Sequence, residues 1–184
     1  EVVNDLLTLG APKARMTVEA TIQQSLKEAH SQAELMQILR QHKARIALLV
    51  ASADIMQSFT LHEVTATLSQ FADVCVNATL DFLLLAAHKR GEITLHNPQS
   101  PQLQSGVVVL GMGKLGAYEL NYSSDIDLVI LYDESKTSYT GKLSPKEYYI
   151  RLTQELVEMI QSRTGEGYVF RVDLRLRPDP YSTP

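Results

Sequence analysis

The spacing of the apolar residues changes once along this chain, near residue 100, and that change limits the folds available to it. Over residues 18–90, apolar side chains recur every three or four positions, which is the period of an amphipathic helix. After a polar stretch with two prolines at residues 97–101, short apolar runs indicate buried strands instead. The sequence therefore predicts an α+β chain, with a helical segment over residues 1–97 and a second domain over residues 98–184. The second domain is expected to be truncated at its C-terminus, because the chain stops among turn-forming residues.

Three helices are expected in the first part. Capping boxes at Ser31 and Thr60, each with a glutamate three residues later, predict two helix starts. A shorter helix is expected over residues 18–29, and Gly91 predicts the end of the third helix. Short connections favour antiparallel packing as a bundle. The lone Cys75 lies on the apolar face of its helix and is expected in the core.

The second part combines strands with one helix. Residues 106–110 and 126–132 are predicted strands, and a capping box with proline at the first helical position predicts a helix from Ser144 to about residue 162. Residues 168–177 alternate in character and predict a third strand.

Composition excludes several classes of protein. The chain has 184 residues, of which 45% are hydrophobic, so it is too apolar for a disordered chain. A net charge of −4 argues against a nucleic-acid partner. No uninterrupted apolar run approaches the roughly 20 residues of a membrane span, so no membrane partner is expected. A single cysteine excludes a disulfide framework and fits a cytoplasmic location.

A glycine motif follows the first predicted strand. Residues 111–116 read Gly-Met-Gly-Lys-Leu-Gly, and Asp133 lies 22 residues after Gly111, where a dinucleotide-binding (Rossmann) fold places its ribose-binding acid. An oxidoreductase of that class is therefore one alternative. Against it, only nine residues separate Gly116 from the next strand, which is short for a crossover helix. A Walker A loop is excluded because Lys-Ser/Thr does not follow Gly116.

Two carboxylates stand at the start of the second predicted strand. Asp125 and Asp127 are two residues apart, so they lie on one side of an extended chain. Such a pair of hard oxygen ligands can hold Mg²⁺, or Mn²⁺, against the phosphates of a substrate. Glycines after a strand let the backbone approach phosphate oxygens, which predicts a binding role for Gly111 and Gly113.

A third carboxylate completes the predicted site. Asp173 lies on the third predicted strand and shares a face with Arg175 and Arg177. Pairing of this strand with the strand of the other two aspartates would bring three carboxylates together, and the two arginines could then neutralise phosphate charge. The hydroxyls of Ser123 and Ser124 are further candidates for phosphate contacts.

Three blocks of the sequence together resemble a known family. They are the glycine motif, the run Glu-Leu-Asn-Tyr-Ser-Ser-Asp-Ile-Asp-Leu at residues 119–128, and Arg-Val-Asp-Leu-Arg-Leu-Arg-Pro at residues 171–178. A glycine followed after eleven residues by Asp-x-Asp is similar to the DNA polymerase β-like nucleotidyltransferases. Within that superfamily, the longer blocks resemble the glutamine synthetase adenylyltransferases. One departure is Ala117, where the family usually has glycine.

This resemblance implies a polymerase β-like fold with a small mixed sheet and a metal-dependent transferase active in nitrogen regulation. The family is bifunctional: one half attaches AMP from ATP to a tyrosine of glutamine synthetase, and the other half removes it by phosphorolysis, giving ADP. The residues around Arg171 and Asp173 resemble the adenylyl-removing half, with the adenylylating half as the alternative. By the same resemblance, Asp125, Asp127 and Asp173 are the catalytic, metal-binding residues.

The resemblance also implies partners. They are glutamine synthetase as protein substrate, a nucleotide and phosphate, and a PII-type signal protein for the full-length enzyme. A further alternative is that this segment is catalytically inert and only docks one of those two proteins.

Overall fold

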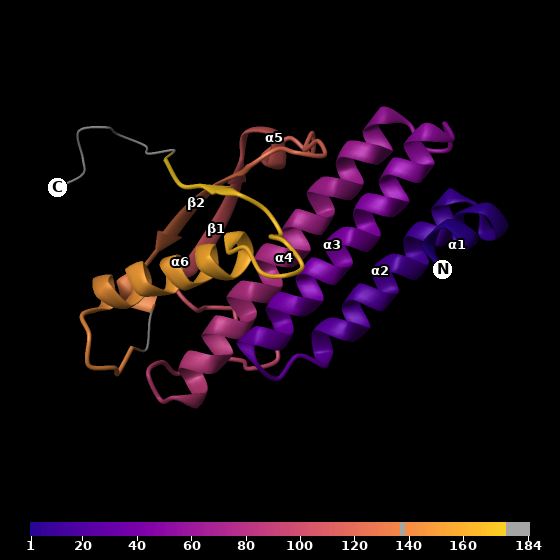
Figure 1. Cartoon of the computed structure of the whole chain (residues 1–184). Coiled ribbons are helices and arrows are strands. Elements are labelled where there is room, and N and C mark those ends of the chain that lie inside the picture. The colour runs from indigo at the N-terminus through magenta and orange to yellow at the C-terminus, as the bar shows by residue number, and fades with distance from the viewer. Residues whose placement is uncertain (137–138, 176–184) are drawn as a thin grey trace.

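A computed structural model describes residues 1–136 and 139–175 as a group of long helices beside a small sheet (Figure 1). The helices of the first part are α1 (Val2–Leu9), α2 (Ala11–Lys27), α3 (Gln32–Ile55) and α4 (Leu61–Lys89). The second part contains β1 (Val107–Met112), the short helix α5 (Gly113–Gly116), β2 (Ile126–Tyr132), the 3-10 turn η1 (Glu134–Lys136), α6 (Pro145–Gln161) and β3 (Val172–Asp173). The predicted α+β class is confirmed.

The predicted helix starts are found where the capping boxes placed them. Ser31, Thr60 and Ser144 each accept a hydrogen bond from the backbone of the glutamate three residues later, and that glutamate bonds back to the cap. Helix α2 starts at Ala11, seven residues before the predicted start at residue 18. Pro12 lies in its first turn, where a proline fits a helix because its missing N–H would have no partner there. Helix α1 was not expected, since eight residues are too few to show a helical period.

The sheet is mixed and has the order β1-β2-β3. Strand β2 pairs antiparallel with β1 and parallel with β3. Its bounds match the predicted strand at residues 126–132. Strand β3 has only two residues, so the prediction of a strand over residues 168–177 was too long.

The antiparallel pairing of β1 with β2 overturns the dinucleotide-binding alternative. A Rossmann unit needs parallel strands joined by a crossover helix, whereas α5, the one helix between β1 and β2, has four residues. Asp133 also lies at the wrong end of the sheet: its amide donates to the carbonyl of Gly106 at 2.7 Å, before β1 begins.

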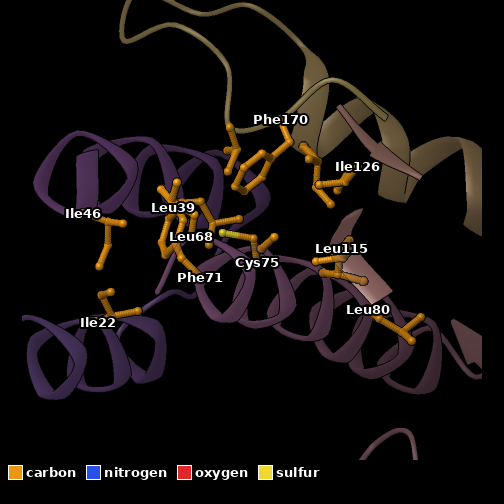
Figure 2. Close-up of a cluster of buried hydrophobic side chains, with 14 of the residues drawn as sticks. Ile22, Leu39, Ile46, Leu68, Phe71, Cys75, Leu80, Leu115, Ile126 and Phe170 are labelled. Atoms are coloured by element: carbon orange, nitrogen blue, oxygen red, sulfur yellow. The ribbon is translucent and has the colours of Figure 1, made fainter. Parts of the chain in front are cut away.

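The two parts share one buried core. Helix α4 supplies Leu68, Phe71 and Cys75 to it, and the rings of Phe71 and Phe170 lie 6.0 Å apart (Figure 2). Cys75 is fully buried, as predicted. Because the core is continuous across both parts, it does not mark a domain boundary, and the division after residue 97 stays a prediction.

Length and apolar composition alone would let helix α4 cross a membrane. The core helix of a soluble protein has the same properties, and half of the most apolar stretch of α4 is buried inside the protein. Helix α4 packs between α3 and α6 (Figure 1). Burial in the core therefore accounts for its composition.

Two cations of α3 hold the segment that leads into β3. Arg40 is only 2% exposed, and its guanidinium donates to four backbone carbonyls, those of Met36 (2.8 Å), Met159 (3.2 Å), Ser162 (2.5 Å) and Gly167 (3.0 Å). Lys43 donates to the carbonyl of Val169, and its ammonium lies 4.6 Å from the centre of the Tyr168 ring. Helix α3 thus fixes the path of the chain between α6 and Asp173.

Candidate active site

An open hollow lies where β1 ends, α5 begins and β2 starts. It is lined by Gly113, Lys114, Asn121, Ser123, Ser124, Asp125, Asp127 and Arg171. Five of the predicted site residues, Gly113, Ser123, Ser124, Asp125 and Asp127, therefore meet at one place. Two cationic side chains border the same hollow, which suits an anionic ligand.

Asp125 carries a partner that the sequence reasoning did not assign to it. The Arg171 guanidinium makes an ion pair with the Asp125 carboxylate and also donates to the carbonyl of Ser123 at 3.0 Å. The carbonyl of Arg171 accepts the amide of Ile126 at 2.9 Å, so pairing of the chain beside β2 brings the arginine to the carboxylate. The sequence signal for this contact was the Arg-Val-Asp block, which we used only as a mark of the family.

Asp127 occupies space that only glycine leaves open at position 113. Gly113 has a φ of +52°, and a Cβ added there would lie 2.6 Å from Oδ2 of Asp127. The missing side chain therefore makes room for a carboxylate oxygen beside the backbone of α5. Asp127 also pairs in register with Met112 at the end of β1.

Gly111 serves packing in this structure. It does not line the hollow, and a Cβ there would lie 3.0 Å from Cγ of Leu115. Gly116 also allows close packing, since a Cβ added there would lie 2.5 Å from the carbonyl oxygen of Gly111. These contacts explain two glycines of the motif, and the phosphate-binding role of Gly111 stays a prediction.

Asp173 lies next to Asp127 across the parallel pair β2 and β3. Residues in register on neighbouring strands project from the same face of a sheet, so the third carboxylate is on the predicted side. Its carboxylate binds Arg175, with Nη2 at 2.6 Å from Oδ2 and Nε at 3.0 Å from Oδ1. Hydrogen bonds from the side chain and the backbone amide of Arg175 lower the pKa of Asp173 to about 2.

The two predicted arginines differ in what the structure shows. The Arg175 side chain and its backbone amide both bind the Asp173 carboxylate. Strand β3 ends at Asp173, so Arg175 is not part of it. Arg177 lies outside the described residues, which end at residue 175. The phosphate-binding roles of both arginines stay predictions.

Residues 1–136 and 139–175 contain no group of three histidine, cysteine, aspartate or glutamate side chains close enough to hold one ion. Asp125 and Asp127 reach the hollow together, while Asp173 lies beside it and is bound by Arg175. The ligand roles of all three therefore stay predictions. The arrangement offers two carboxylates, two hydroxyls and nearby cations around a solvent-open space, which is chemistry suited to a metal-bound phosphate ester.

The loop between α5 and β2 is held by residues that sequence reasoning missed. Asp54 of α3, and Ser69 and Asp73 of α4, each bond to this loop. These partners are 45 to 68 residues away in sequence, so no local pattern could reveal them.

Substituting Gly113 with alanine tests the packing of Asp127. The new methyl group would displace the Asp127 carboxylate, and the positive φ would strain any side chain there. We expect Gly113→Ala to lose about 1–2 kcal/mol of unfolding free energy and to bind Mn²⁺ more weakly. Urea titration and calorimetry measure the two effects. Gly165→Ala is the control, because its Cβ would meet open space at an ordinary φ; equal metal binding by Gly113→Ala and wild type would contradict the assignment.

A family model matches this chain along its whole length. The family is described as glutamate-ammonia ligase adenylyltransferase, and the match covers residues 1–184.

Curated relatives give the same result. The chain is 53% identical to a bifunctional glutamine synthetase adenylyltransferase/adenylyl-removing enzyme of Rhizobium meliloti, over 83% of this chain and 15% of that protein. It is 48% identical to the protein of the same description in Mesorhizobium japonicum, over 91% of this chain and 17% of that protein. For the Rhodopseudomonas palustris protein, the identity is 44% over 95% of this chain and 18% of that protein. The chain thus spans less than a fifth of the length of these relatives, and it belongs to the glutamate-ammonia ligase adenylyltransferase family.

Proposed function

We propose that this chain carries a metal-dependent nucleotidyltransferase site that removes AMP from an adenylyl-tyrosine of glutamine synthetase. The observation that carries the proposal is the meeting of Asp125 and Asp127 in one hollow, with Asp173 in register beside them. The names of the relatives support the choice of glutamine synthetase as the protein substrate.

The residues of the hollow fit a divalent cation. Carboxylate oxygens are the ligands that Mg²⁺ and Mn²⁺ prefer, and the missing side chain of Gly113 leaves room for the Asp127 oxygen. Asp125, Asp127 and Asp173 would hold the metal. When bound, it would neutralise phosphate charge and stabilise the departing tyrosine oxygen.

The other residues bind and orient the reactants. Ser123 and Ser124 lie on the rim of the hollow, where their hydroxyls can donate to phosphate oxygens. Arg171 and Arg175 can transfer their hydrogen bonds from carboxylate to phosphate, because guanidinium binds both groups in the same forked geometry. The Asp173 carboxylate is charged at neutral pH whether or not Arg175 binds it, because even the ordinary pKa of an aspartate is near 3.8. It can therefore serve as an acceptor that orients the attacking oxygen throughout the neutral range.

The proposed reaction is phosphorolysis. An oxygen of inorganic phosphate forms a bond to the phosphorus of the AMP group, and the bond from that phosphorus to the tyrosine oxygen breaks. ADP leaves, and the proton that hydrogen phosphate loses in forming ADP passes to the tyrosine oxygen, directly or through water. The direction rests on the resemblance of the Phe170-Arg171-Val172-Asp173 context to the adenylyl-removing half of the family.

Adenylylation of glutamine synthetase by ATP is the second candidate, because the names of the relatives cover both activities. A PII-type signal protein is the regulatory partner in either case. A cytoplasmic location belongs to the same proposal, and the buried, unpaired Cys75 is consistent with it.

The proposal predicts phosphate-dependent release of ADP. Adenylylated glutamine synthetase, inorganic phosphate and Mg²⁺ are incubated with the natural polypeptide that contains these 184 residues. We expect ADP to form, and to stop forming when phosphate is omitted or the metal is chelated. ADP formation that continues without a divalent cation would contradict the proposed chemistry.

A further inference from the structure

Three hydrogen bonds connect the long helices to the loop that carries Asp125. The Tyr118 hydroxyl donates to Oδ2 of Asp73 at 2.7 Å, and the Tyr122 hydroxyl donates to Oδ2 of Asp54 at 2.9 Å. Between them, the amide of Leu120 donates to Oγ of Ser69 at 3.1 Å. Residues 117–125 are therefore tied to both α3 and α4.

The hydrogen bond between Leu120 and Ser69 is inside the protein. Ser69 and Leu120 are both fully buried, and the Ser69 hydroxyl donates in turn to the carbonyl of Thr65 at 2.8 Å. A buried amide without an acceptor is costly, so the loop backbone is fixed at Leu120. The two tyrosines on either side bind the loop to α4 and α3 at two further points.

The loop needs such support because its backbone is not in a relaxed conformation. Tyr118 has a φ of 59°, in the left-handed region that bulky residues rarely adopt. A residue keeps such a conformation only where its surroundings hold it there. The contacts of Tyr118 and Leu120 with α4 supply that support at the start of the loop.

Tyr122 lies closest to the candidate site. It directly precedes Ser123 and Ser124, which line the hollow, and is three residues before Asp125. Tyr122 is about half exposed, and desolvation of its hydroxyl together with the bond to Asp54 raises its pKa to about 12. The hydroxyl is therefore protonated at neutral pH, as an ordinary tyrosine also is, and donates to Asp54. Asp54 lies in the last turn of α3, where a negative charge is unfavourable to the helix. Its location is therefore better explained by the contact with Tyr122 than by the stability of α3.

We propose that Asp54 and Tyr122 form a positioning pair, through which the helical segment holds the Asp125 loop in its metal-binding shape. This inference rests on the proposed function, because it concerns the same metal site. Neither residue lines the hollow, so the pair acts through the backbone between Tyr122 and Asp125.

Metal titration of the 184-residue chain tests the pair. Tyr122→Phe removes one hydroxyl and keeps the ring, and Asp54→Ala removes the acceptor. Each is expected to weaken Mn²⁺ binding about fivefold. The variant loses one hydrogen bond to a charged group, and only part of that loss is expected to reach the metal site. The double variant is expected to match either single variant, and Asp54→Asn, which keeps an acceptor oxygen, to stay within about twofold of wild type.

A second measurement does not depend on metal. Hydrogen exchange of the Leu120 amide should become faster in Tyr122→Phe and Asp54→Ala, while amides of α6 keep their rates. Tyr139→Phe is the matched control, because it removes a tyrosine hydroxyl that accepts from Leu143 near the start of α6.

The outcomes separate this inference from the proposed function. Metal binding by wild type that is unchanged in folded Tyr122→Phe and Asp54→Ala would overturn the positioning pair and leave the proposed function intact. A wild type that binds no divalent cation would overturn the metal site itself. If the wild type binds no cation, faster exchange of the Leu120 amide in Tyr122→Phe and Asp54→Ala would still show that the helices hold the loop. Unchanged exchange in both variants would overturn the role of the pair in holding the loop.

Discussion

Replacing Asp125 and Asp127 together with asparagine should abolish Mg²⁺ and Mn²⁺ binding while the chain stays folded. The two carboxylates are the ones that reach the hollow together, so the double change removes two of the three charges proposed to hold the cation. Asparagine preserves the volume of each side chain, and the sheet register of Asp127 is made by its backbone. Calorimetric titration should therefore show no binding heat, and circular dichroism should show an unchanged helix content.

The control for this experiment removes the same total charge elsewhere. Glu28 follows α2, and Glu134 begins the 3-10 turn beyond β2; both are exposed. The Glu28→Gln/Glu134→Gln variant should bind metal as wild type does. Unchanged affinity in the Asp125→Asn/Asp127→Asn variant would show that these carboxylates are not the ligands.

The second large effect concerns stability. Arg40→Met should cost about 2–4 kcal/mol of unfolding free energy, because four carbonyl oxygens in a largely buried region lose a hydrogen bond from the guanidinium. The carbonyl of Gly167 keeps the amide of Thr164 as a donor, so the loss is expected mainly at the other three. Methionine fills much of the same volume, so the loss measures hydrogen bonding more than packing. Urea denaturation followed by circular dichroism measures it. Because Arg40 fixes the chain that leads to Asp173, the variant should also bind Mn²⁺ more weakly.

Arg45 supplies the comparison on the same helix. It faces solvent and pairs with Glu1 at 3.3 Å, so Arg45→Met should change the unfolding free energy by less than about 0.5 kcal/mol. Equal losses in the two variants would mean that the interior carbonyls find other donors, and that the anchoring role of Arg40 is wrong.

Local signals in the sequence predicted a large part of the fold. The capping boxes at Ser31, Thr60 and Ser144 satisfy amides within one turn, so their sequence is sufficient to mark a helix start. Strand β2 was predicted at its observed bounds because it is an apolar run preceded by turn residues. The placement of Asp125 and Asp127 on one side follows from the period of an extended chain.

Long-range contacts explain what could not be predicted. The alternation at residues 168–177 suggested a long strand, but Arg40 and Lys43 hold the chain before Val172, and Arg175 binds back to Asp173. The hydrogen bonds of Tyr118 and Tyr122 likewise have their acceptors on helices far away in sequence. The glycine motif was ambiguous for the same reason, since only the pairing of β1 with β2 excludes the dinucleotide-binding fold.

The most direct test of the proposed function measures two reactions on one variant of the natural polypeptide that contains these residues. One assay follows incorporation of AMP from ATP into glutamine synthetase, and the other follows phosphate-dependent release of ADP from the adenylylated enzyme. Each half of a bifunctional enzyme needs its own carboxylates, so we expect Asp125→Asn/Asp127→Asn to abolish ADP release and to leave AMP incorporation intact. Loss of incorporation with ADP release preserved would assign these residues to the adenylylating site, and survival of both reactions would show that Asp125 and Asp127 are not catalytic.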